Sequence, residues 1–289
     1  MCGGTIMMNW RSRLAEPRSL FLAPAGLFLV ALFLVPLAIL LYYTFLQRGA
    51  YGGVLPAFTL ENWQRLVDPL YAGILYRTSL VALVSTLICL LLGFPLALFI
   101  ARAERHRNLY LHLVMLPFWT SFLVRTYAWM FLLRDTGLVN TVLQATGIIK
   151  EPLPLLYNYG AVVLGLVYGY LPFMVLPLYA TLERIDKSLL DAAADLGAKP
   201  LQTLWRVTLP LSAPGIAAGC VLVFIACLGA YLTPDLLGGG KTILAGTLIQ
   251  NQFTNARDWP FGAALSLSMM ALVVGMLYAG IGRRKERLL

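Results

Sequence analysis

Charged residues are scarce in this 289-residue chain, and apolar residues are correspondingly abundant. Only 12% of the residues are Asp, Glu, Lys or Arg, whereas 60% are hydrophobic. Soluble globular domains carry about 25% charged residues, so a soluble domain is excluded as the main body of the chain. No stretch between the apolar segments is long enough for a soluble catalytic domain. The sequence therefore predicts a membrane protein that is not an enzyme.

Histidine and cysteine are also scarce, which limits the chemistry that the chain can carry. The two histidines, His106 and His112, lack other metal-ligating residues nearby, so no metal site is predicted. The four cysteines lie in the first residues or in apolar segments, and no disulfide framework is implied. An intramembrane enzyme would need paired acids and bases or a Ser–His or Ser–Lys arrangement, and none is evident. The cysteines are Cys2, Cys89, Cys220 and Cys227.

Six apolar segments are each long enough to cross a bilayer core, which takes about 20 helical residues. Backbone groups in lipid must be satisfied within the segment, so these spans are predicted to be helices. The alternating pattern of a membrane barrel is absent. The predicted fold class is all-α, with one six-helix membrane domain over residues 21–281. The spans are Phe21–Phe45, Thr78–Ala101, Leu109–Leu133, Asn158–Thr181, Ala213–Leu232 and Phe261–Ile281.

Basic residues are divided unequally between the two sides of the predicted membrane domain. With six spans, both termini share one side, which holds fourteen of the 22 Lys and Arg residues, against seven on the other side and Arg125 within a span. Cytoplasmic loops are enriched in Lys and Arg, so the tail at residues 1–20 and the basic tail at residues 282–289 are both predicted to be cytoplasmic. Topology thus explains the net charge of +9, and no nucleic-acid partner is predicted.

A charged segment at about residues 182–210, here called the polar hairpin, interrupts the apolar spans. Asp186 is predicted to cap its first helix, Gly197 to end that helix, and Pro200 to lie in the first turn of a second one. In the first half, apolar residues recur at helical spacing, namely Leu182, Ile185, Leu189, Ala192 or Ala193, and Leu196. In the second half, one helix face carries Leu201, Leu204, Trp205 and Thr208. Such an amphipathic hairpin between membrane spans predicts a docking element for a soluble partner.

The polar hairpin resembles the EAA loop of permease subunits of ABC importers. The family pattern is Glu-Ala-Ala, a Gly four residues after the second Ala, and an apolar-x-Leu-Pro sequence that begins ten residues later. Asp191, Ala192, Ala193, Gly197, Val207, Leu209 and Pro210 occupy these places. Asp191 stands where Glu is usual, and Val207 where Ile is common. The alternative is an amphipathic loop that matches by chance and packs only on the ends of its own helices.

The resemblance implies a type I importer permease with the MetI-like architecture, which forms half of a translocation pathway. It implies no cofactor on this chain, because ATP and Mg would bind to a dimer of separate ATP-binding subunits. The other implied partners are a second permease subunit, a different and PotC-like chain, and a periplasmic or lipoprotein substrate-binding protein. The location implied is the bacterial inner membrane. The residues implied in coupling to the ATPase are Asp191, Ala192, Ala193, Gly197, Ala198, Leu209 and Pro210.

Three further segments resemble the polyamine-type permeases, the PotB-type subunits of spermidine/putrescine importers. They are Pro117–Trp129, Leu155–Asp186 and Asn251–Ala264. The resemblance implies polyamines as the transported substrate. Relatives that import other organic cations, 4-aminobutyrate or opines share much of the pattern, so these substrates remain open. A secondary transporter would require membrane-embedded acids and inverted repeats, and neither is found.

Aromatic residues on the predicted spans form a candidate substrate pathway. Aromatic faces attract a cation by roughly 0.5–2 kcal/mol, so a polycation pathway is expected to contain them together with a few carboxylates. The alternative is the belt of Trp and Tyr found at membrane interfaces. The candidates are Trp119, Tyr127, Trp129, Tyr168, Tyr170 and Tyr231, with Asp235 as the acid.

Arg125 lies inside the third predicted span, where an ionisable residue is costly. A fixed positive charge in the pathway would repel a polycation. Arg125 is therefore predicted to be structural and held by an ion pair or by hydrogen bonds to carbonyl groups. An anionic substrate would reverse that prediction.

Glycine-rich segments allow two further predictions. Gly238–Thr242 ends like a P-loop, but the leading glycine of that motif would fall at Asp235, and the segment follows a span rather than a strand. It is predicted to be a flexible external turn. The pairs Gly165/Gly169 and Gly215/Gly219 have the small-xxx-small spacing that permits tight helix packing.

Overall fold

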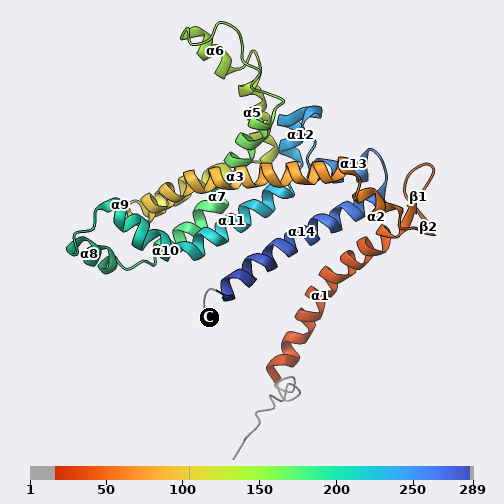
Figure 1. Cartoon of the computed structure of the whole chain (residues 1–289), viewed down its shortest axis with the longest axis horizontal. Helices are drawn as coiled ribbons and strands as arrows, with labels where there is room; N and C mark the ends of the chain where they lie inside the picture. The colour runs from red at the N-terminus through yellow and green to blue at the C-terminus, as the bar shows by residue number, and fades with distance from the viewer. Residues whose placement is uncertain (1–16, 104, 287–289) are drawn as a thin grey trace, which may run out of the picture.

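The computed structural model describes residues 17–103 and 105–286, which are predominantly helical (Figure 1). The long helices are α1 (Pro17–Thr44), α3 (Pro69–Arg102), α7 (Tyr159–Leu182), α11 (Ala213–Leu228) and α14 (Trp259–Glu286). An antiparallel pair of strands, β1 (Leu46–Arg48) and β2 (Val54–Phe58), connects α1 to α2 (Glu61–Leu66). The all-α fold class is confirmed, apart from this small pair.

Helices α3, α7 and α11 form the central bundle, and its core residues include Cys89, Met174 and Val223. Close approach of α11 to α7 depends on two glycines. A Cβ atom on Gly215 would lie 2.8 Å from the carbonyl oxygen of Pro177, and one on Gly219 would lie 2.7 Å from Sδ of Met174. The prediction that these glycines serve tight helix packing is confirmed.

The molecule has two distinguishable ends (Figure 1). At the hairpin end, the central bundle is followed by α8 (Lys187–Asp195) and α9 (Pro200–Thr203). At the strand end lie β1, β2, α2 and α13 (Ala245–Thr254). Helices α1 and α14 meet the bundle at the strand end and diverge from it toward the other end. Apolar side chains of α1 are therefore exposed, such as Leu27 (73%) and Phe33 (67%).

Four of the described helices are long and apolar enough to cross a bilayer, namely α1, α3, α7 and α14. A fifth span results if Pro200–Leu211 and Ala213–Leu228, which are bent by 67°, are counted together. The count of six stays a prediction. The fifth helix ends at Leu228 rather than Leu232, the second begins at Pro69, and the sixth extends to Glu286. The predicted N-terminal tail lies outside the described residues up to residue 16.

The prediction of one continuous helix over Leu109–Leu133 is wrong. The segment is divided into α4 (Arg107–Met115), the 3-10 turn η2 (Leu116–Trp119) and α5 (Phe122–Leu133). Pro117 lies in the first two residues of the tight turn, and Thr120 and Ser121 then take extended backbone conformations with ψ angles of 153° and 133°. The hydroxyl of Thr120 donates to the carbonyl of Pro117 at 2.7 Å, which satisfies one group freed by the break. A proline and two hydroxyl-bearing residues therefore interrupt the span.

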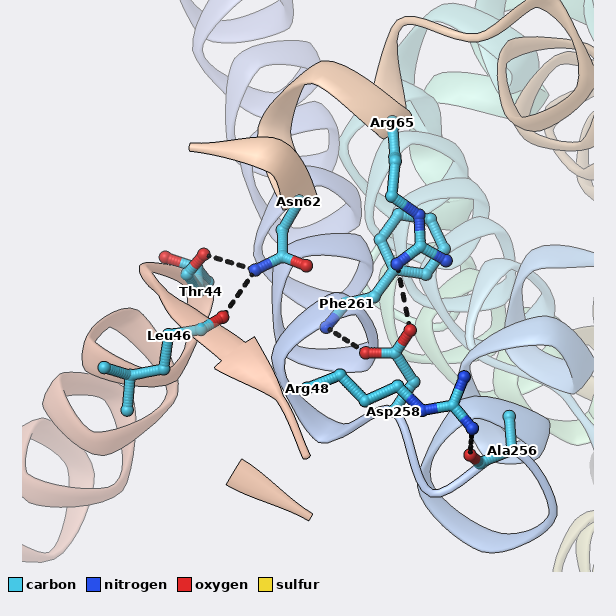
Figure 2. A network of polar contacts seen from close by, with 8 residues as sticks. All are labelled: Thr44, Leu46, Arg48, Asn62, Arg65, Ala256, Asp258 and Phe261. Atoms are coloured by element: carbon cyan, nitrogen blue, oxygen red, sulfur yellow. Dashed lines mark hydrogen bonds and ion pairs between the residues drawn. The ribbon is translucent and has the colours of Figure 1, made fainter. Parts of the chain in front are cut away.

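A network of polar contacts, here called the strand-end clamp, joins α1 and α2 to the start of α14 (Figure 2). The buried Asn62 donates to the carbonyl groups of Thr44 (3.0 Å) and Leu46 (2.9 Å). Arg65 pairs with Asp258 at 2.9 Å, and its guanidinium lies 3.8 Å from the centre of the Phe261 ring. Asp258 also accepts from the backbone N–H of Phe261 at 3.2 Å. The clamp fixes where α1 and α14 leave the bundle.

Replacement of Asp258 by asparagine is expected to destabilise the strand end by about 1–3 kcal/mol, because Asp258 is buried and Arg65 loses its charged acceptor. The Arg65 side chain is 35% exposed, so water compensates for part of the loss. Thermal unfolding of the purified protein would measure the effect. Asp68→Asn is the matched control, because that exposed acid caps α3 and an amide can replace it there. Equal unfolding temperatures for the two variants would contradict the role of the clamp.

Candidate functional site

The first helix of the polar hairpin, α8, has the caps that its sequence predicts. The carboxylate of Asp186 accepts from the backbone N–H of Ser188 at 2.9 Å, and this contact lowers the pKa of Asp186. At the other end, Gly197 has a φ angle of +80°. Its N–H donates to the carbonyl of Ala194 at 2.8 Å, and that of Ala198 donates to Ala193 at 3.0 Å. These two bonds form a Schellman motif, so Gly197 ends α8 in the left-handed region that favours glycine.

The second half of the polar hairpin is a short, irregular helix that leads back into the bundle. Pro200 begins α9, and the N–H of Lys199 donates to Oε1 of Gln202 at 2.9 Å. The winding widens over η3 (Leu204–Thr208) and returns to α-helical in α10 (Leu209–Leu211), which contains Pro210. The 67° bend between α10 and α11 then directs the hairpin away from the bundle axis.

The polar hairpin exposes apolar side chains in both of its halves. Exposed fractions are 47% for Leu189, 89% for Leu196, 65% for Leu201 and 62% for Trp205. Of the predicted coupling residues, Asp191, Ala192, Gly197 and Pro210 are exposed, whereas Ala193, Ala198 and Leu209 are half-buried. Exposed apolar groups gathered on a charged segment are typical of a protein interaction site. The alternative of a hairpin packed only on its own helix ends leaves Leu196 and Trp205 unexplained.

A cavity of about 530 Å³ lies where the polar hairpin joins the bundle. Its lining includes Arg102 at the end of α3, Arg107 at the start of α4, and Asp191 in α8. Arg107 pairs with Glu183 at 2.5 Å, which links α4 to the end of α7. At this end, the Arg107–Glu183 pair joins α4 to the start of the hairpin, and the hairpin faces the end of α3 across the cavity.

The predicted pathway residues lie on four different elements. Trp119 in η2 is 74% exposed, Tyr127 in α5 is 39% exposed and Tyr231 before α12 (Leu232–Gly238) is 47% exposed. Asp235 in α12 is also exposed. Trp129 and Tyr168 are brought together, since their rings meet edge to face with centroids 5.5 Å apart. Tyr170 instead packs on Phe122 and Phe173. Within the described residues, no ring contact joins Trp119, Tyr127 or Tyr231 to the Trp129–Tyr168 pair.

Arg125 is not held as the sequence predicted. Among the described residues, Nε and Nη1 of Arg125 are buried without a hydrogen-bond partner. Instead, the guanidinium carbon lies 5.7 Å from the ring centre of Phe118 and 5.5 Å from that of Phe122. The expected ion pair or carbonyl contact is therefore missing within this part of the chain. Arg125 also shares a small cavity with Trp129 and Tyr168, a proximity that sequence reasoning missed.

Helix α12 packs against α7 because Gly165 leaves space for it. A Cβ atom on Gly165 would lie 2.5 Å from Cδ1 of Leu237 and 2.7 Å from Cγ2 of Thr233. The sequence marked Gly165 as a close-packing position, but it did not identify a short helix after the fifth span as the partner.

The two ends of the segment Gly238–Thr242 are packed, whereas Gly240 in its middle is exposed with open surroundings, so the expected flexible turn stays a prediction. Gly239 has a φ angle of +57°, and a Cβ atom there would lie 2.7 Å from the Tyr157 ring. The Thr242 side chain is buried. The segment follows α12 and not a strand, so its setting differs from that of a P-loop.

The described residues contain no group of three His, Cys, Asp or Glu side chains that could hold a metal ion. His112 contacts the carbonyl of Asn108 in its own helix, at 2.5 Å from Nδ1. Cys89 and Cys227 are buried free thiols. The prediction that this chain binds no cofactor stays a prediction.

The comparisons with known proteins agree with this architecture. A family model described as "Binding-protein-dependent transport system inner membrane component" matches residues 28–287. The spermidine/putrescine transport system permease protein PotB of Escherichia coli (strain K12) is 44% identical over 250 residues, which cover 86% of this chain and 90% of that protein. PotB of Haemophilus influenzae is 41% identical over 251 residues, with coverages of 86% and 88%.

A solved structure shows the same fold. A crystal structure of a bacterial ABC transporter involved in the import of the acidic polysaccharide alginate contains a chain that superposes with a TM-score of 0.74. The match covers 95% of this chain and 98% of that chain at 19% identity, so it supports the fold alone. The fold is thus the MetI-like fold of ABC importer permeases. Because the family model and the relatives both span most of its length, the chain belongs to the family of inner membrane components of binding-protein-dependent transport systems.

Proposed function

We propose that this chain is a permease subunit of a polyamine importer and forms half of the pathway for spermidine and putrescine. The observation that carries the proposal is the 44% identity to PotB over 86% of the chain. A match of 250 residues is long enough to include the polar hairpin, the broken third span and α12. Membership of the family makes the chain a transport component of the inner membrane.

The polar hairpin is the proposed coupling element. It docks on a separate ATP-binding subunit that carries ATP and Mg, and the contact is made by Asp191, Ala192, Ala193, Gly197, Ala198, Leu209 and Pro210. The exposure of Leu196, Leu201 and Trp205 supports this role, because docking would remove them from water. The salt bridge between Arg107 and Glu183 would transmit movement of the hairpin to α4 and α7.

The family implies a second permease subunit, ATP-binding subunits and a substrate-binding protein. We assign the second permease to a different, PotC-like chain and the ATPase to a dimer. We place both termini and the hairpin end on the cytoplasmic side of the membrane. Arg102, Arg107, Arg184, Lys187, Lys199 and Arg206 all lie at that end of the described chain, and this segregation of positive charge supports the orientation.

The substrate pathway is assigned to the exposed aromatic side chains of Trp119, Tyr127 and Tyr231 with the carboxylate of Asp235. These groups would replace part of the hydration shell of a polycation through cation–π and ionic contacts. The rings of Trp129 and Tyr168 pack edge to face beside Arg125. We therefore assign them to shaping the pathway and not to binding the positively charged substrate.

ATP hydrolysis by the complete reconstituted complex, with its binding protein, tests the proposal. Spermidine and putrescine are expected to stimulate hydrolysis well beyond the level seen with an unrelated amino acid. Stimulation by 4-aminobutyrate, an opine or an anion, but by neither polyamine, would reject the substrate and retain the permease. A folded protein that associates with no ATPase would reject the proposed coupling as well.

A further inference from the structure

Helices α5 and α6 form an arm that projects from the central bundle (Figure 1). The α5–α6 arm comprises η2, α5 and α6 (Leu138–Ala145) with their connections, residues 116–147. In the described chain it exposes apolar side chains over most of its length. Exposed fractions are 55% for Leu116, 62% for Val124, 59% for Phe131 and 50% for Val142. The apolar surface of this projecting arm is not covered by residues 17–103 or 105–286, so another molecule is expected to cover it.

The backbone at the base of the arm points to protein rather than lipid as that covering. The break at Thr120 and Ser121 leaves backbone groups outside regular helical bonding. Taken along the bilayer normal from Arg107 at the predicted cytoplasmic boundary, the nine residues of α4 rise about 14 Å before this break. That depth lies inside a hydrocarbon core of about 30 Å. Irregular backbone at membrane depth is tolerated where it is buried in protein or lines a water-filled cavity.

The charge of Arg125 distinguishes between protein and a water-filled cavity as the surroundings of this break. Nε and Nη1 are buried without an acceptor among the described residues, and the rings of Phe118 and Phe122 lie within 6 Å of the guanidinium. The residue is half-buried, and only Nε and Nη1 of its guanidinium are enclosed, which leaves Nη2 for a group from outside the chain. Intramembrane charges pair with one another or with carbonyl groups. A group of opposite charge is the complement that this site lacks.

We propose that the α5–α6 arm packs against the second permease subunit and that a carboxylate of that subunit pairs with Arg125. The inference rests on the proposed function, since it requires a second permease. It also resolves the conflict between Arg125 and a polycationic substrate, because a paired guanidinium no longer repels the substrate. A water-filled pathway at this position would leave the full positive charge facing the polyamine.

Photo-cross-linking in the complete transporter tests the arm directly and keeps Arg125 unchanged. A photoreactive amino acid in place of Val124, one residue from Arg125, is expected to capture the second permease subunit. The same probe in place of Leu196 is the matched control and is expected to capture the ATP-binding subunit. Capture of lipid, the binding protein or another copy of this chain from position 124 would overturn the inference. Failure at position 196 alone would instead contradict the proposed coupling.

Substitution of Arg125 tests the pairing. In Arg125→Gln, the dissociation constant between the two permease subunits, measured in detergent without substrate, is expected to rise about tenfold or more. Arg77→Gln is the control, because Arg77 is an exposed arginine on α3 and lies outside the arm. An unchanged dissociation constant for Arg125→Gln would reject the pairing. If Arg125→Gln does not fold, a charge swap decides. Arg125→Glu is combined with Asp→Arg or Glu→Arg substitutions in the spans of the second subunit. Only the swap at the true partner of Arg125 is expected to restore association.

Discussion

Replacement of Gly197 by aspartate is expected to uncouple ATP hydrolysis from transport while the protein stays folded in the membrane. Within the described chain, no heavy atom lies within 4 Å of a Cβ atom at this position. The new side chain therefore causes no clash in this subunit. At a φ angle of +80°, it costs roughly 1–2 kcal/mol of local strain in an exposed turn.

The larger effect of Gly197→Asp arises at the docking surface. The carboxylate would sit beside the exposed Leu196 and would be buried against the ATP-binding subunit without a designed partner. Loss of about 1.4 kcal/mol of docking free energy already changes the docked population tenfold. Substrate transported per ATP hydrolysed is therefore expected to fall at least about tenfold in proteoliposomes.

Gly53→Asp is the control that separates strain from lost docking. Gly53 has a φ angle of +81° and the same open surroundings, but it lies at the strand end. This variant is expected to carry a similar strain and to keep coupled transport. Normal transport by Gly197→Asp, or equal loss in both variants, would refute the assignment of the hairpin as coupling element.

Replacement of Gly215 by alanine is expected to destabilise the central bundle. The added Cβ atom would lie 2.5 Å from Oγ1 of Thr181 and 2.8 Å from the carbonyl oxygen of Pro177. The second contact is with the backbone of α7, so the helices must separate. Overpacking of this kind costs about 1–3 kcal/mol, which exceeds the gain of about 1 kcal/mol from the helix propensity of alanine.

Gly73→Ala provides the opposite case within α3. No heavy atom of the described chain lies within 4 Å of a Cβ atom at Gly73. Alanine is therefore expected to raise the stability by up to about 1 kcal/mol through helix propensity alone. Thermal unfolding in detergent should show shifts of opposite sign for the two variants. A stabilised Gly215→Ala would contradict the close packing of α11 on α7.

Much of the architecture could be predicted because its causes are local in the sequence. A helix in lipid satisfies its backbone groups within four residues, so the length of an apolar run suffices to predict α1, α7 and α14. The ends of α8 also depend on neighbours in sequence. The carboxylate of Asp186 accepts from the N–H of Ser188, two residues on, and the N–H of Gly197 donates to the carbonyl of Ala194, three residues back. The polar hairpin was therefore predicted with its caps.

The break in the third span was within reach of the sequence but was outweighed by its apolar composition. Pro117, Thr120 and Ser121 are local signals for a tight turn and an extended step. The surrounding residues are nevertheless apolar enough for one helix of Leu109–Leu133. Whether such a run continues or breaks depends on what surrounds it, because broken helices persist only where protein or water satisfies the freed groups.

Contacts between distant residues were decided by the tertiary structure. Arg65 and Asp258 are 193 residues apart, and neither has a local feature that identifies the other as its partner. The neighbours of Arg125 come from η2, α5 and α7, and the packing of α12 on Gly165 joins segments about 70 residues apart. The helices, the caps and the family of the chain could be predicted from the amino-acid sequence, because each depends on short-range bonds or on a spaced motif. Which side chains share a site, and which buried charge lacks an acceptor, depends on how the helices pack and could be read only from the folded chain.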